Sequence, residues 1–169
     1  MYERDPLPYH GGLVSFFRTP SIEIEQITEG LAVVAGVPID NGVTHGRARA
    51  RFGPRAIREA SLGDIFEPGD PEDQNIFIDM VDGTGSRLKK KPEVADMGDF
   101  NVYPTDLMKT TESVIHGMTE VVKRGAFAVL LGGDHYVTYP SFTGFAKGVA
   151  ERIPNVRLGY IHIDSHTDF

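Results

Sequence analysis

Residues 126–168 decide the fold, and they read AFAVLLGGDHYVTYPSFTGFAKGVAERIPNVRLGYIHIDSHTD. The continuous apolar run at 126–131 predicts a buried strand, and apolar residues at helical spacing predict a helix over 139–151. A second apolar run at 157–163 predicts another strand. Strand, helix and strand in succession are typical of a parallel sheet with crossover helices. We therefore expect an α/β fold.

The same patterns continue toward the N-terminus. A valine-rich run bounded by glycine and proline predicts a buried strand, and helical periodicity ending at a glycine predicts a long helix. A proline at the first position predicts a short helix beginning at Gly53. The region 62–91 is rich in Gly, Asp and Lys, so we expect it to be mostly loop. The expected elements are an irregular arm over 1–30, strands over 31–38 and 94–99, and a helix over 104–124.

Composition excludes several classes of protein. The 169 residues are enough for one domain, and the absence of cysteine excludes disulfides and thiolate metal sites. A net charge of −7 argues against general nucleic-acid binding. The arginines between 47 and 58 are therefore interpreted as loop anchors or subunit contacts. With no apolar run of membrane-spanning length and no signal-like start, we expect a cytoplasmic protein without a membrane partner.

Acidic and histidine side chains gather where two of the predicted strands end. In extended backbone Asp164, His166 and Asp168 share one face, and imidazole with carboxylate suits Mn, Fe, Co, Ni or Zn. A capping network at a strand end is the alternative. His135 follows the neighbouring strand, and sites in such sheets form beyond the carboxyl ends of the strands. We expect ligand atoms of His135 and Asp164 within about 4.5 Å of each other. His162 precedes Asp164 by two residues and could share this face, but it is interpreted as a core histidine.

Together these motifs resemble the ureohydrolase superfamily of arginases and agmatinases. The resemblance rests on GGDH at 132–135 and HIDSHTD at 162–168. The motifs GVPID at 36–40, RFGPRAIR at 51–58 and VADMGD at 94–99 are similar to the agmatinase and guanidinobutyrase branch. The resemblance implies an arginase-type three-layer α/β/α sandwich, present whole or as its N-terminal half. Residues 31–169 would be the N-terminal part of the catalytic domain, ending after the second metal motif.

The resemblance also implies a site and a reaction. Two divalent ions, Mn with Ni as the alternative, would be held by His135, Asp164, His166 and Asp168, with Asp164 bridging them. A hydroxide shared by the ions would attack the guanidino carbon of agmatine, guanidinobutyrate or a related guanidine, giving urea and an amine or ammonia. The protein would be a homo-oligomer, a trimer or hexamer. The acid–base and guanidinium-binding residues are expected downstream of Phe169, so the segment alone is expected to be incomplete.

Two other functions stay open at this point. One is a non-catalytic truncated ureohydrolase paralogue that acts as a binding or regulatory partner. The other is an amide-cleaving deacetylase on the same fold. A deacetylase would be expected to carry an adjacent His-His pair as its acid–base element, and the sequence has none.

Overall fold

The computed structural model describes residues 14–43, 48–62, 76–79, 85–88 and 92–166. Its centre is a sheet of three parallel strands, β1 (Ala32–Val37), β4 (Val94–Asp99) and β5 (Phe127–Gly132), in the order β4-β1-β5. β1 lies between the other two strands, and nearly every one of its residues is buried, as expected for a strand that is covered on both faces. The predicted parallel sheet is confirmed.

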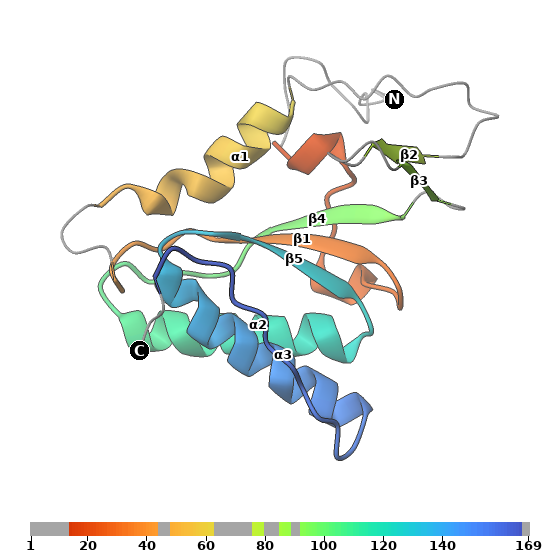
Figure 1. Ribbon diagram of the computed structural model, residues 1–169. Coiled ribbons are helices and arrows are strands. Elements are labelled where there is room, and N and C mark those ends of the chain that lie inside the picture. The colour runs from red at the N-terminus through yellow and green to blue at the C-terminus, as the bar shows by residue number, and fades with distance from the viewer. Residues whose placement is uncertain (1–13, 44–47, 63–75, 80–84, 89–91, 167–169) are drawn as a thin grey trace, which may run out of the picture.

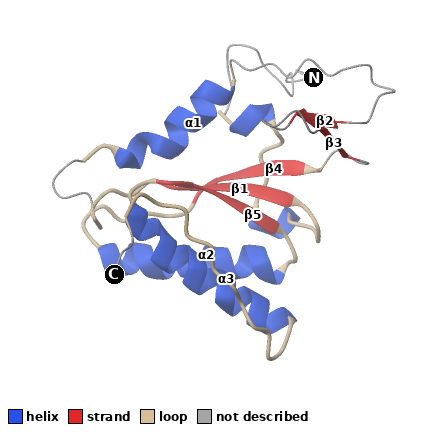
Figure 2. Ribbon diagram, in the orientation of Figure 1, coloured by secondary structure: helices blue, strands red, loops and turns tan. Residues whose placement is uncertain are grey.

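Helices cover both faces of this sheet (Figure 1). α1 (Gly53–Ser61) lies on one side, and α2 (Leu107–Lys123) and α3 (Thr138–Arg152) lie on the other (Figure 2). These three layers confirm the predicted α/β/α sandwich. α1 begins at Gly53 as predicted, and both ends of α3 lie within one residue of the predicted limits. α2 ends one residue earlier and begins three residues later than predicted.

The core lies between the sheet and α2. The Asp106 carboxylate caps α2 by accepting the Lys109 N–H at 2.9 Å, and apolar residues at helical spacing then face the sheet. The side chains that meet there are Val33, Ala35, Val37, Val114, Met118, Val121 and Val122, all at most 5% exposed. Burial of this apolar surface is the main force holding the sheet to α2.

A buried ion pair joins α1 to β4. The Arg58 guanidinium donates to Asp96 Oδ2 at 2.7 Å and Oδ1 at 2.9 Å, to Asp99 Oδ1 at 2.6 Å and to the Gly98 carbonyl at 3.0 Å. Asp96 also accepts the Phe16 N–H at 2.8 Å, which attaches residues before β1 to the sheet. Burial disfavours the charged guanidinium, but the hydrogen bonds to Asp96 and Asp99 outweigh it and raise the pKa of Arg58.

A second anchor lies in the loop after β1. The buried Asp40 accepts hydrogen bonds from the Arg51 Nε at 2.6 Å and the Arg49 N–H at 2.6 Å. The hydrogen bond from Arg51 holds the pKa of the Asp40 carboxyl below its ordinary value. The interpretation of the arginine run as loop anchors is therefore confirmed for Arg51, whereas Arg58 belongs to the interior of the fold.

The structure differs from the predicted local structure at two places. The region expected to be mostly loop contains an antiparallel pair, β2 (Ile76–Asp79) and β3 (Gly85–Leu88), separate from the main sheet. The predicted strand over 157–163 is also absent, because that stretch is extended and pairs with no strand of the described chain. Within the described residues, no helix has the length and apolar character needed to cross a membrane.

Candidate metal centre

His135 is placed by the turn that follows β5. It opens a short 3-10 helix, η4 (His135–Val137), directly beyond the carboxyl end of the strand. Gly133 makes this turn possible, because a Cβ there would lie 1.8 Å from the Ile39 carbonyl oxygen. The hydroxyl of Tyr136 lies 2.9 Å from that of Thr111, which ties η4 to α2. The His135 side chain remains 36% exposed at the sheet edge.

His162 and Asp164 reach His135 from an extended segment, not from a strand. After α3 the chain returns across that helix (Figure 1), and the Tyr160 ring contacts the Phe142 ring at a centroid distance of 5.2 Å. On the other side of the segment Ile161 and Ile163 are 88% and 93% exposed. A strand in a parallel sheet needs cover on both faces, and this side has none among the described residues. The contact with α3 places the segment beside η4.

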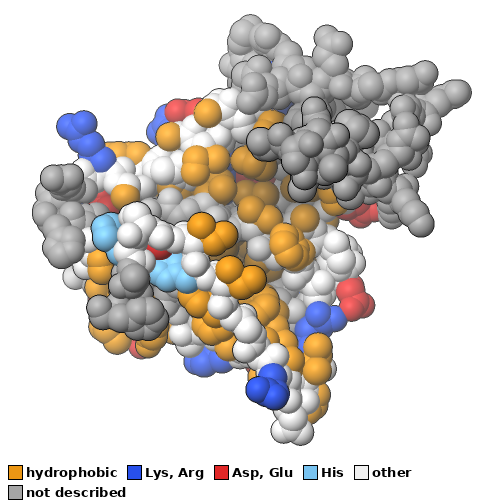
Figure 3. Space-filling model, viewed as in Figure 1, with side chains coloured by type: hydrophobic (Ala, Val, Ile, Leu, Met, Phe, Trp, Pro, Cys, Tyr) orange, Lys and Arg blue, Asp and Glu red, His pale blue; other side chains and the backbone are white. Residues whose placement is uncertain are grey.

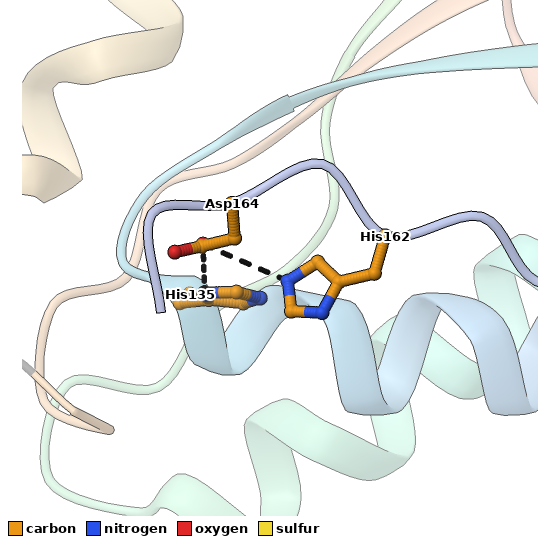
Figure 4. A group of neighbouring side chains, drawn as sticks. All are labelled: His135, His162 and Asp164. Carbon is orange, nitrogen blue, oxygen red and sulfur yellow. Dashed lines mark ion pairs between the residues drawn. The ribbon is translucent and has the colours of Figure 1, made fainter. Parts of the chain in front are cut away.

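Three ligand-type side chains converge at this point (Figure 4). The Nδ1 of His135 lies 3.0 Å from Oδ2 of Asp164, and the Nε2 of His162 lies 3.6 Å from the same oxygen. The two imidazole rings meet edge to face, with centroids 5.1 Å apart. The expected proximity of His135 and Asp164 is confirmed, and each of the three residues offers an atom to a common centre.

His166 contacts the second oxygen of Asp164. Its backbone N–H donates to Oδ1 at 2.8 Å, and its ring Nδ1 lies 3.3 Å from that oxygen. The hydrogen bond from this backbone N–H lowers the pKa of Asp164, burial acts in the opposite direction, and the three neighbouring imidazoles lower it further. The His166 ring is 82% exposed. Asp168, the fourth predicted ligand, lies outside the described residues.

The interpretation of His162 as a core histidine was wrong. Its side chain is 28% exposed and contacts the carboxylate that the predicted site shares. The signal was its spacing, because residues two apart in extended backbone point to one side. In the space-filling view, histidine side chains reach the surface on this face, beside apolar side chains (Figure 3). The side chains of His135 and His162, which are 36% and 28% exposed, are thus partly open to solvent.

Comparison with known protein sequences indicates one family. The sequence model of the arginase family matches residues 31–169. Human mitochondrial guanidino acid hydrolase is 34% identical over 159 residues, covering 93% of this chain and 38% of that protein. Mitochondrial agmatinase from Gallus gallus is 33% identical over 158 residues, covering 93% of this chain and 40% of the relative. The chain thus spans about two fifths of the length of these relatives.

A solved structure supports the fold independently. The crystal structure of a hypothetical agmatinase from Burkholderia thailandensis superposes with a TM-score of 0.59 at 24% identity. The match covers 87% of this chain and 43% of that one. It confirms the predicted arginase-type fold. Because the names of both sequence relatives place them in mitochondria, the expected cytoplasmic location stays a prediction.

Proposed function

The chain belongs to the arginase family, and from this premise we propose that the protein hydrolyses a small guanidino compound to urea and an amine. The observation that carries the proposal is the convergence of His135, His162 and Asp164 at the carboxyl end of the sheet. Open parallel sheets place their sites at this edge. The names of the two relatives, a guanidino acid hydrolase and an agmatinase, support the same class of substrate.

The donor atoms of the cluster fit a divalent transition metal. Imidazole nitrogen and carboxylate oxygen together suit Mn, Ni and Zn better than Ca or Mg. We assign His135, Asp164, His166 and Asp168 as the ligands of a two-metal centre that holds Mn, with Ni as the alternative. His162 joins this set as a further candidate, since its Nε2 faces the Asp164 oxygen that His135 also faces.

The geometry of Asp164 supports its assignment as the bridging ligand. Its Oδ2 faces His135 and His162, whereas its Oδ1 faces His166, so the two oxygens address different partners. A side chain that is 21% exposed and held from both sides offers both oxygens with little loss of conformational entropy. The backbone N–H of His166 fixes the orientation of the carboxylate. A bound ion of this kind lowers the pKa of water to about 7, which supplies a nucleophile strong enough for a guanidinium.

Membership of the family also supports a proposal for the substrate and one for the assembly. We propose agmatine, guanidinobutyrate or a related small guanidine as the substrate, with residues 31–169 as the N-terminal part of the catalytic domain. The net charge of −7 favours a cationic guanidinium over a nucleic acid. We further propose that the protein is a homo-oligomer, a trimer or hexamer.

A urea-release screen tests the proposal. The full-length protein, with the whole catalytic domain of which residues 31–169 are the proposed N-terminal part, is loaded separately with Mn²⁺ and Ni²⁺ and assayed against agmatine, 4-guanidinobutyrate, 3-guanidinopropionate and arginine. We expect turnover of at least one compound, its loss in His135→Asn, and no change in His116→Asn. His116 is the matched control because it is exposed on α2 and lies outside the cluster. Urea release that survives His135→Asn, or no release with any of the compounds, would contradict the proposal.

A further inference from the structure

The carboxylate of Asp134 joins the turn that carries His135 to the loop that follows β1. Its Oδ2 accepts the Gly42 N–H at 2.8 Å and the Val43 N–H at 3.0 Å. Asp134 is 7% exposed, so water competes little for these bonds. Hydrogen bonds from backbone N–H groups to a carboxylate are about twice as strong as neutral ones. The start of the loop and the turn are therefore held together as one unit.

The same residue fixes the backbone on both sides of His135. Asp134 Oδ1 accepts the Tyr136 N–H at 3.1 Å, and its carbonyl oxygen accepts the Val137 N–H at 3.2 Å. Each of these bonds closes a ring that contains the backbone of His135. The Asp134 N–H donates to the Ile39 carbonyl at 2.8 Å, which fixes the turn against the end of β1.

From this arrangement we propose that Asp134 is a positioning residue that sets the orientation of His135 toward Asp164. The carboxylate accepts three backbone N–H groups from two chain segments. These bonds fix the backbone from which the His135 side chain points toward Asp164. The orientation rests on geometry alone, whereas its consequence for metal affinity rests on the proposed function.

The first test is Asp134→Asn. Asparagine has one acceptor oxygen, so its NH₂ must face either the Tyr136 N–H or the two loop N–H groups, and one of the two links is lost. In the metal-free protein we expect amide hydrogen exchange at the lost link to rise about 10- to 100-fold, at Gly42 and Val43 if the loop link is lost and at Tyr136 if the turn link is lost. We also expect the nuclear Overhauser contact between the rings of His135 and His162 to weaken. The dissociation constant for Mn²⁺ should rise about 10- to 100-fold.

The matched control is Asp106→Asn. Asp106 caps α2 through the Lys109 N–H at 2.9 Å, and it does so at an exposed position on another element. Asparagine is as good an N-cap as aspartate. The control should leave both the ring contact and the Mn²⁺ affinity unchanged. If Asp134 only capped its helix, as Asp106 does, Asp134→Asn would leave the ring contact and the Mn²⁺ affinity as unchanged as Asp106→Asn does.

A second variant approaches the same link from the loop. In Gly42→Ala the new Cβ would lie 2.3 Å from the Cβ of Tyr136, which separates the loop from the turn while Asp134 stays in place. If Asp134→Asn does not fold, Gly42→Ala tests the positioning role in its place. Unchanged ring contact and Mn²⁺ affinity in the folded variants, despite faster exchange at Val43 or Tyr136, would overturn the inference. If the unaltered protein binds no Mn²⁺ but the ring contact depends on Asp134, the proposed function fails and the positioning role stands.

Discussion

Replacing Arg58 with methionine should lower the free energy of unfolding by about 3–4 kcal/mol. The substitution keeps much of the apolar stem but removes the guanidinium that neutralises Asp96, whose side chain is 2% exposed. Removing one partner of a buried ion pair leaves an uncompensated charge and costs about 3–5 kcal/mol. We place the loss in the lower half of this range because Asp96 retains the N–H groups of Phe16 and Gly98, each at 2.8 Å.

Urea unfolding monitored by circular dichroism measures this loss, with Arg55→Met as the matched control. Arg55 lies on the same helix, but its pair with Glu59 is exposed, and such pairs add little to stability because solvent screens them. In a domain of this size, 3–4 kcal/mol corresponds to a fall in Tm of about 6–16 °C. The double variant Arg58→Met/Asp96→Asn should be more stable than Arg58→Met, because it no longer buries an unpaired carboxylate. The gain is only partial, because asparagine has one acceptor oxygen and loses the N–H of either Phe16 or Gly98.

Two results would refute this reasoning. The first is a loss in Arg58→Met of under about 1 kcal/mol, no larger than an exposed pair gives. The second is a double variant that is less stable than Arg58→Met, since the unpaired charge would then cost less than the one N–H acceptor that Asp96→Asn removes. A loss of the expected size, relieved by Asp96→Asn, would support the ion pair as the link between α1 and β4.

Three further predictions concern the site and its surroundings. In the full-length protein, Asp164→Asn should abolish urea release with little change in the unfolding midpoint, and retained turnover in a colorimetric urea assay would contradict its role. Gly133→Ala should destabilise the protein by about 1–3 kcal/mol in thermal unfolding, because the new Cβ meets the Ile39 carbonyl; an unchanged Tm would show that the turn adapts. The lowered pKa of Asp40 means that its pair with Arg51 stabilises the fold fully above pH 3.8, and that this contribution is lost as the pH falls through the lower folded-state pKa. Acid unfolding of Asp40→Asn should therefore depend less on pH below 3.8 than that of the unaltered protein, and identical profiles would contradict this.

Two of the three parallel strands could be predicted from apolar runs, although β5 lies at the edge of the described sheet and most of its residues are only half-buried. The runs at 31–38 and 126–131 are almost wholly apolar, and they correspond to β1 and β5. The pair β2 and β3 could not be predicted in this way. Each strand has four residues, and they lie within a stretch whose Gly, Asp and Lys content is typical of loops.

Buried polar contacts between distant segments were beyond the reach of sequence patterns. Arg58 occupies one face of a short helix like any surface arginine, and only the fold brings it within 2.7 Å of Asp96, 38 residues further along the chain. The loop N–H groups that Asp134 accepts are likewise more than 90 residues away from it. Such links depend on which segments become neighbours, and single-sequence periodicity carries no information about that.

The expected contact at the candidate site is present although the strand expected to carry it is absent. The prediction depended on two premises, that ligands two residues apart share a face and that their segment ends beside His135. Extended backbone alternates its side chains whether or not it is paired in a sheet. Tyr160, His162 and Asp164 accordingly face α3 and η4, while Ile161 and Ile163 face away and are almost fully exposed. The ring contact between Tyr160 and Phe142 holds the segment in place of sheet pairing. The approach of Asp164 to His135 thus follows from alternation and from one aromatic anchor.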